Sequence, residues 1–348
     1  MLPKKKQNEI LYLSFNKDKT CLALGMKKGY RIYELTKKDS LSFYERILGK
    51  AIGIIEMLER TNILGLVGDE SNEAFDEPNK LNIYDDKESK IIAYITFKKK
   101  IKHIRLKKDL ILVILENFIY LIDVKEFKQF ETIELGYDIQ TKTIFSFTLE
   151  PEINNLDYNY IDQQNHKIKI NTYEKEKRIN SLDLKSDYKS KNIILCMEFS
   201  SEGKMLAVSA QNYNYLILYR VDDGIPICKC NINSNPINYS YISFEENNEF
   251  LCISLDIGEV YIFNIKSINE QLDYFNQENK EQIKEEIWSK FYLPEKKTIC
   301  TFSGDEIGRD HIICVGARGN YYLVKFNNLQ KEDLALKINE KYILRAEN

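Results

Sequence analysis

The chain has 348 residues, with 50 lysine and arginine residues against 53 aspartate and glutamate residues. This near balance gives no overall field that would favour nucleic acid as a partner. Hydrophobic residues make up 43% of the chain and aromatic residues 12%, which is enough to fill a sizeable core. We expect one domain over residues 1–348.

The seven cysteines are odd in number and lie mostly within apolar runs, where a free thiol behaves as a small apolar side chain. They indicate a reducing compartment. Cys228 and Cys230 have no second Cys or His pair at metal spacing, so packing is favoured over zinc. No apolar run approaches the ~20 residues of a membrane-spanning helix. The three histidines form no recognisable catalytic motif, and we expect neither enzymatic activity nor a cofactor.

Strand-like runs rich in Ile, Val, Leu and Tyr recur along the chain at spacings of 37 to 62 residues: Arg31–Leu35, Leu81–Asp85, Phe118–Val124, Lys167–Tyr173, Tyr215–Val221, Glu259–Ile265 and Tyr321–Phe326. Most are preceded by a second apolar run: Cys21–Met26, Ile63–Val67, Ile111–Leu115, Met205–Ser209, Phe250–Ser254 and Ile312–Val315. This is close to the period of a four-stranded propeller blade. We therefore predict an all-β fold, a single seven-bladed β-propeller of the WD-repeat type.

Three segments interrupt the pattern. The acidic, turn-rich stretch Asp69–Asn79 is predicted to be a loop in the second blade. The poorly patterned segment Glu134–Asn165 is expected to hold most of the fourth blade. Residues 267–288 form a predicted sixth-blade insertion, a loop or short helix, whose later half can be helical.

A basic cluster precedes and enters the third blade: Lys98, Lys99, Lys100, Lys102, Arg105, Lys107 and Lys108. Such a run is usually a solvated strand edge that resists pairing with other edges. It is also the best remaining candidate for contact with an acidic partner or a lipid headgroup.

From Arg31 to Val124 the chain resembles the PROPPIN family, the phosphoinositide-binding propellers of autophagy that include the WIPI proteins. The resemblance is carried by Ser14–Asp18, Arg31–Tyr33, Glu56–Gly68, Asn79–Asp86 and Arg105–Tyr120, in the family's order and spacing. It continues more weakly through most of the chain except the fourth blade. The chain is most similar to the WIPI3/WIPI4-like branch.

The resemblance implies a lipid-binding motif of two adjacent arginines between the fifth and sixth blades. Arginine suits phosphate because its guanidinium gives two parallel hydrogen bonds. The motif positions fall on Cys230, Asn231, Ile232 and Asn233, so both arginines are absent.

Supporting positions of the two family pockets have changed as well. The family's pocket-lining residues correspond to positions near Ser190, Ala210 and Asn214. In the sixth blade a Thr is replaced by Glu259 and a His by Tyr261, while Ser254 remains. A carboxylate at residue 259 would repel a phosphate at short range. We expect weak or absent phosphoinositide contact.

The sixth-blade insertion dips into the bilayer in the family. Here Tyr274, Phe275 and Trp288 are possible apolar anchors, but residues 267–288 hold six acidic residues against two lysines. An anionic leaflet disfavours that balance.

The resemblance also assigns Asn16 and Asp18 to docking of the autophagy lipid-transfer scaffold protein. The alternative is a β-turn alone, because Asn-Lys-Asp-Lys is good turn chemistry. We expect both residues on an exposed turn, with Asp69–Asn79 and the basic cluster on the same side of the ring.

The interpretation that follows is a non-enzymatic, monomeric scaffold in autophagy or membrane traffic, with degenerate phosphoinositide pockets. It would be cytoplasmic, with peripheral attachment to autophagic or endosomal membranes. One alternative is an autophagy effector that binds phosphatidylinositol 3-phosphate through an altered pocket. Another is a structural subunit of a larger complex.

Overall fold

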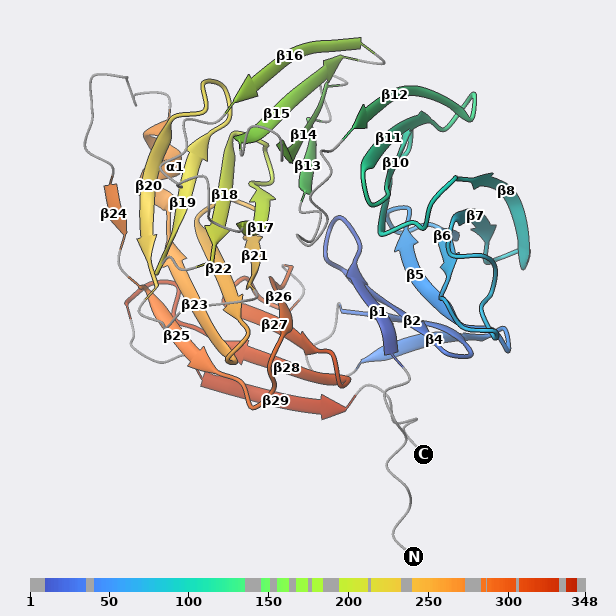
Figure 1. The fold of residues 1–348 in the computed structure, drawn as a ribbon. Helices are drawn as coiled ribbons and strands as arrows, with labels where there is room; N and C mark the ends of the chain where they lie inside the picture. Colours follow the sequence, from blue (N-terminus) through green and yellow to red (C-terminus); the bar gives the residue numbers. More distant parts are fainter. Residues whose placement is uncertain are drawn as a thin grey trace, which may run out of the picture.

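In the computed structural model, antiparallel sheets surround a central axis (Figure 1). The structure describes residues 10–35, 41–134, 145–150, 155–162, 167–174, 177–183, 194–211, 214–232, 240–272, 283–285, 287–304, 307–331 and 336–342. Within β13–β16, β24 and β29 it describes the backbone alone.

The described residues form seven sheets, each built mainly from consecutive strands. The first two sheets contain β1 (Ile10–Phe15), β2 (Cys21–Met26), β3 (Gly29–Glu34) and β4 (Ser42–Ile47), then β5 (Ile52–Met57), β6 (Ile63–Gly68), β7 (Lys80–Asp85) and β8 (Lys90–Thr96). The next two contain β9 (His103–Leu106), β10 (Leu110–Ile114), β11 (Phe118–Asp123) and β12 (Lys128–Glu134), then β13 (Phe145–Glu150), β14 (Asn155–Asp162), β15 (Lys167–Glu174) and β16 (Lys177–Asp183).

The remaining sheets complete the ring. The fifth contains β17 (Ile194–Phe199), β18 (Met205–Ala210), β19 (Tyr215–Arg220), β20 (Pro226–Asn231) and β24 (Ile283–Glu285). The sixth contains β21 (Ser240–Phe244), β22 (Phe250–Leu255), β23 (Glu259–Asn264) and β25 (Ser289–Tyr292). The seventh contains β26 (Thr298–Phe302), β27 (His311–Gly316), β28 (Asn320–Lys325) and β29 (Leu336–Tyr342).

The recurring apolar runs are the second and third strands of these sheets. The second strands β2, β10, β18, β22 and β27 are buried along their whole length. Both faces of such a strand pack on neighbouring sheets, so its sequence is continuously apolar instead of alternating. The outermost strands β4 and β8 are mostly exposed.

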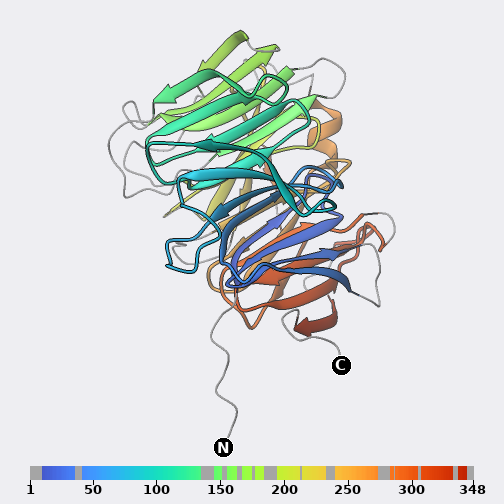
Figure 2. The ribbon, with the colours of Figure 1, turned by 90° about the vertical axis from the view of Figure 1, so that its right-hand side faces the viewer.

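The first and seventh sheets lie side by side (Figure 2). Their facing strands pack Leu22 and Leu24 of β2 in one apolar cluster with Val315 and Leu323. Innermost strands of successive sheets also contact one another, as β1 does β5 and β17 does β21. Burial between sheets, rather than within one sheet, therefore holds the ring together.

The prediction of a seven-bladed propeller with an inserted loop or short helix in the sixth blade is wrong in this form. Only six sheets have described side chains on their strands, and the fifth has five strands. Residues of the insertion leave the sixth sheet, because β24 pairs in parallel with β20 of the fifth. The helix α1 (Lys266–Glu270) lies at the beginning of the insertion, not in its later half.

Each sheet has two ends, which we name by their turns. The AB face carries the turns between first and second strands, such as residues 16–20 and 58–62. The BC face carries the turns between second and third strands, such as residues 69–79 and 256–258, and the connections between sheets. Antiparallel strands alternate in direction, so the two sets of turns lie at opposite ends of the sheets.

Candidate functional site: the junction of the fifth and sixth sheets and the first AB turn

The positions of the lipid motif lie at the BC-face end of β20. Cys230 is fully buried, Asn231 is exposed at the last residue of the strand, and Ile232 is 1% exposed. Asn233 lies outside the described residues. The backbone N–H of Ile232 donates to the carbonyl of Asn214 at 2.5 Å, which fixes this segment against β19.

Apolar packing fills this junction. Cys230, Ile232, Leu255 and Tyr261 belong to one buried cluster between the fifth and sixth sheets. Tyr261 is the position at which the family resemblance expects a pocket histidine. A charge placed at residue 232 would have to be buried among these groups, which is costly unless it is paired.

Three of the polar side chains at these positions, those of Ser254, Glu259 and Tyr261, bond within the protein. The Ser254 hydroxyl is buried and donates to the carbonyl of Thr298 at 2.7 Å. The Tyr261 hydroxyl donates to the Glu259 carboxylate at 2.7 Å. Burial, followed by this bond to Glu259, raises the pKa of Tyr261. Ala210 is fully buried, and Ser190 lies outside the described residues.

The turn between β22 and β23 approaches the following connection closely. Gly258 has a φ of +87°, and a Cβ there would lie 2.4 Å from the carbonyl oxygen of Leu293. Only glycine fits this position without displacing backbone. The turn therefore holds Glu259 at a fixed place on the BC face.

Trp288 is packed on the propeller. Its indole N–H donates to the carbonyl of Asn327 at 2.7 Å, and its ring meets Phe250 edge-on at 5.9 Å between centroids. Tyr274 and Phe275 lie outside the described residues. Of the three predicted membrane anchors, Trp288 therefore serves the protein's own packing.

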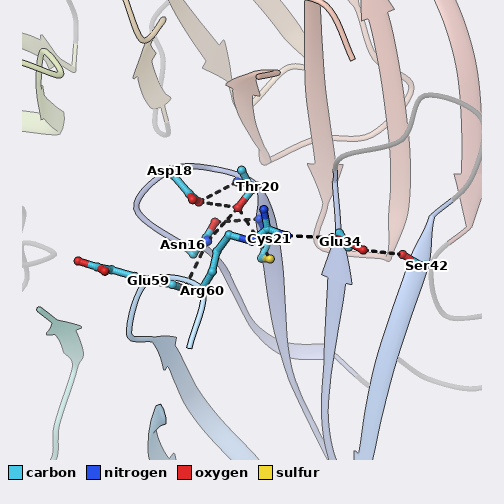
Figure 3. Close-up of polar contacts among 8 residues, drawn as sticks. All are labelled: Asn16, Asp18, Thr20, Cys21, Glu34, Ser42, Glu59 and Arg60. Carbon is cyan, nitrogen blue, oxygen red and sulfur yellow. Dashed lines mark hydrogen bonds and ion pairs between the residues drawn. The ribbon is translucent and has the colours of Figure 1, made fainter. Parts of the chain in front are cut away.

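Asn16 is a buried structural residue, and the expectation that it is exposed is wrong. Its side chain is 3% exposed and accepts from the N–H of Cys21 at 2.8 Å. Its amide donates to the Thr20 hydroxyl at 3.2 Å and to the Glu59 carbonyl at 3.4 Å (Figure 3). These bonds close the first AB turn and connect it to the second sheet.

Asp18 lies at the exposed tip of the same turn, as expected. Its carboxylate accepts from the N–H and hydroxyl of Thr20 at 3.1 Å and 2.6 Å (Figure 3). Nearby, Arg60 donates to Glu34 at 2.9 Å between the first two sheets. Asp18 thus extends from a turn whose backbone is held firmly.

The loop Asp69–Asn79 and the first part of the basic cluster lie on the other face. Strand order places the loop between β6 and β7 and residues 97–102 between β8 and β9, both on the BC face. Lys100 pairs there with Glu70. The expectation that the loop and the whole cluster border Asp18 on one side of the ring is wrong, because consecutive turns alternate between ends. Of the cluster, Lys107 and Lys108, in the turn between β9 and β10, lie on the AB face with Asp18.

Arg105 does not lie on the solvated strand edge that was expected for the basic cluster. It forms a salt bridge with Glu56 of the neighbouring sheet at 3.1 Å, and the Glu56 side chain is 7% exposed. Burial raises the pKa of Glu56 to about 7, although the Arg105 guanidinium opposes the shift. Glu56 interrupts the otherwise apolar first strand Ile52–Met57, a signal in the sequence that predicts a paired charge.

Lys19 makes polar contacts with the sixth sheet that the sequence did not indicate. It follows Asp18 in the first AB turn, with a φ of +59°. Its ammonium donates to the Ser243 hydroxyl at 2.7 Å and the Phe244 carbonyl at 2.8 Å, both on the first strand of the sixth sheet. Burial lowers the pKa of Lys19. A turn lysine alone gives no clue to such a distant partner.

The described part of the chain has neither a metal-binding cluster nor a membrane-spanning helix. No group of three or more His, Cys, Asp or Glu side chains there could hold a metal ion. None of the helices described is long and apolar enough to span a bilayer.

The comparisons with known proteins agree with the resemblance. The sequence model of the PROPPIN family matches residues 10–274. Autophagy-related protein 18 of Debaryomyces hansenii is 25% identical over 329 residues, covering 86% of this chain and 57% of that protein. Autophagy-related protein 18 of Komagataella pastoris is 24% identical and is covered to 52%. The chain thus spans little more than half the length of these relatives.

Solved structures of similar fold cover nearly the whole chain. Kluyveromyces lactis Hsv2p superposes with a TM-score of 0.74 at 18% identity, covering 97% of this chain and 99% of that one. Atg21 in a complex described as KlAtg21 with the coiled coil of AgAtg16 gives 0.74 at 20% identity, covering 96% and 99%. At these identities the structures establish the fold alone. The family match over most of the sequence does more: this chain belongs to the PROPPIN family.

Proposed function

We propose that the chain is a protein-interaction scaffold in autophagy or related membrane traffic, with degenerate phosphoinositide pockets. Family membership and the names of its autophagy-related relatives support the setting. Within the family we place it nearest the WIPI3/WIPI4-like branch, on the resemblance of residues 31–124. Its compartment would be cytoplasmic, with peripheral attachment to autophagic or endosomal membranes.

One observation supports the proposed loss of lipid binding most strongly. Cys230, Ile232 and Tyr261, three positions that the resemblance assigns to the lipid site, are buried in one apolar cluster. Phosphate recognition needs cationic or polar donors that converge on an open pocket. The Ser254 hydroxyl and the Glu259 carboxylate already bond within the protein.

The partner surface is proposed to include Asp18. Its carboxylate is exposed on a turn that Asn16 fixes from beneath. A prepositioned charge binds with a smaller ordering cost than one on a flexible loop. An autophagy lipid-transfer scaffold is the partner that the resemblance implies. The complex of KlAtg21 with the coiled coil of AgAtg16 is consistent with protein partners for this fold.

Flotation on liposomes tests the lipid part of the proposal. Vesicles of phosphatidylcholine with and without about 5 mol% phosphatidylinositol 3-phosphate should recover equal, low amounts of the protein. Specific recovery with the phosphoinositide would instead support the alternative of an effector with an altered pocket.

Quantitative capture from cells tests the partner part. Asp18→Arg should lose partners that Asp18→Asn retains at least in part, because reversed charge leaves an unpaired group in the interface, costing about 2–5 kcal/mol. If both variants retain every partner, Asp18 serves only its turn. Stable co-purification in a stoichiometric complex unaffected by either change would favour a structural subunit.

A further inference from the structure

The outer edge of the second sheet exposes three large apolar side chains on one strand. On β8, Ile91, Ile92 and Tyr94 are 44%, 48% and 63% exposed. This strand ends the sheet order β5-β6-β7-β8 and lies at the outer rim of the molecule (Figure 1). A long apolar edge strand is a template for pairing, and proteins usually protect such edges with charges or proline.

The backbone of β8 offers groups at this open edge. Phe97 donates its N–H to the carbonyl of Asn79 at 2.9 Å, and the register continues through Thr96 opposite Lys80 and Tyr94 opposite Asn82. Hydrogen-bonded and non-bonded pairs alternate in an antiparallel ladder. The N–H and C=O groups of Tyr94 and Thr96 therefore point away from β7, toward the open edge.

The outer strand of the first sheet also exposes large side chains, and Ile47 at its end is 73% exposed. Its two aromatic rings, however, contact arginines. Arg31 covers the ring of Phe43 at 5.1 Å, and Arg46 covers that of Tyr44 at 5.5 Å. Tyr44 also contacts Asp86 of the second sheet at 3.4 Å. The aromatic groups of β4 are thus already engaged within the protein.

The fold itself contains an example of strand addition. Ile283–Glu285 pairs in parallel with β20 and extends the fifth sheet by one strand. An extended segment can therefore join the rim of this propeller through main-chain hydrogen bonds. The edge of β8 has the same position in the second sheet as β20 has in the fifth.

Exposed lysines at both ends of β8 favour an acidic partner. Lys87 and Lys90 precede or begin β8, and Lys98 and Lys99 follow it, all exposed. Glu88 pairs with Lys90, and Glu116 lies 3.8 Å from Lys99, whereas no ion pair among the described residues includes Lys87 or Lys98. Antiparallel pairing of two copies of β8 would bring these lysines together, and like charges across strands are destabilising.

We propose that β8 is a docking edge for an extended acidic segment of a partner protein, which adds to the second sheet as a further strand. Alternate apolar side chains of the segment would lie against Ile92 and Tyr94, and acidic residues at its ends would meet Lys87 and Lys98. Lys80, 4.5 Å above the Tyr94 ring, would adjoin the same face. The inference rests on the proposed scaffold role and names a second surface for it, apart from Asp18.

The probe is a fluorescent synthetic peptide with a central run of alternating Val and Thr and paired Asp residues at both ends. N-methyl groups along one edge prevent its self-association, and a control peptide carries them along both edges. We expect polarisation to show saturable binding of the probe to the full chain. The doubly methylated peptide, and a peptide with Lys in place of Asp, should bind at least tenfold more weakly.

Variants of β8 and its flanking lysines test whether the probe binds at this edge. Thr96→Pro removes one outward N–H but retains Ile91, Ile92 and Tyr94, and proline is tolerated on an edge strand at such a position. It should weaken binding at least tenfold, whereas Thr96→Val should not. Lys87→Glu with Lys98→Glu should give a similar loss without altering the edge. Melting temperatures identify any variant that fails to fold, in which case the charge variant decides.

Absence of probe binding, equal binding of the Lys-ended peptide, or full binding by folded Thr96→Pro and Lys87→Glu/Lys98→Glu variants would overturn the inference. So would dimerisation of the chain through β8, which Thr96→Pro would abolish. Loss of probe binding on Asp18→Arg with retention on Thr96→Pro would also refute it, while leaving the scaffold role supported.

Discussion

At the scale of single residues, burial separates the two residues that the family resemblance assigned to docking. Asn16 and Asp18 are two positions apart in one turn, yet one is 3% exposed and the other lies at the tip. The sequence predicts the turn correctly, because Asn-Lys-Asp-Lys is turn chemistry. It does not predict which polar side chain bonds inward, since that depends on Glu59 of the adjacent sheet.

Asn16→Ala should therefore lower the free energy of unfolding by about 1–3 kcal/mol, since it leaves the N–H of Cys21 and the carbonyl of Glu59 without their bonds. Asp18→Asn, on the exposed tip, should change it by no more than about 0.5 kcal/mol. Chemical denaturation of the two variants measures both values. Equal stabilities would refute a structural role for Asn16.

Glu56 makes a distinct prediction about pH. Its folded pKa is raised from 4.5 to about 7 by burial, so the folded state binds this proton more tightly than the unfolded state. Its contribution to stability is fully present below about pH 4.5 and is lost as the pH rises toward about 7.

Between about pH 5 and about pH 8, the wild type should lose about 2 kcal/mol more stability than Glu56→Gln, which cannot titrate. Denaturant unfolding at a series of pH values gives the difference, in which all shared groups cancel. If the wild type instead gains stability relative to Glu56→Gln as the pH rises, the attraction of Arg105 outweighs the effect of burial on the pKa of Glu56.

At the scale of elements, periodicity located the strands well. The predicted runs Cys21–Met26 and Phe118–Val124 correspond to β2 and β11 within a residue. The insertion was located less well, because β20, the strand with which β24 pairs, lies more than fifty positions earlier in the sequence. Short segments that join an existing edge have no period of their own, so only the three-dimensional structure identifies them.

Trp288 gives the prediction for the insertion. Trp288→Ala should lower the free energy of unfolding by about 2–4 kcal/mol, because it removes the contact with Phe250 and the bond to Asn327. Trp288→Phe keeps an aromatic ring and should cost about 1 kcal/mol, mainly through the lost N–H donor. Membrane recovery should be the same for both. A fall in recovery without a fall in stability would instead make Trp288 a membrane anchor.

At the scale of the whole molecule, the propeller architecture and the absence of both arginines could be predicted from the chain. The apolar filling of the junction could not, because Cys230, Ile232, Leu255 and Tyr261 come from three strands and a connection that meet only in the fold. The same limit applies to the two faces. Alternation of turns follows from strand order, and it separates Asp18 from Asp69–Asn79 once the strands are in place.

The central claim is that lipid binding has been lost in the packing of this junction as well as at the motif. The direct test is flotation of Asn231→Arg/Ile232→Arg on vesicles containing phosphatidylinositol 3-phosphate, beside a PROPPIN that retains both arginines. Residue 232 is buried and Glu259 remains nearby, so we expect the double variant to be less stable and to stay far below the intact protein in recovery. Recovery equal to that of the intact protein, with unchanged stability, would contradict the account.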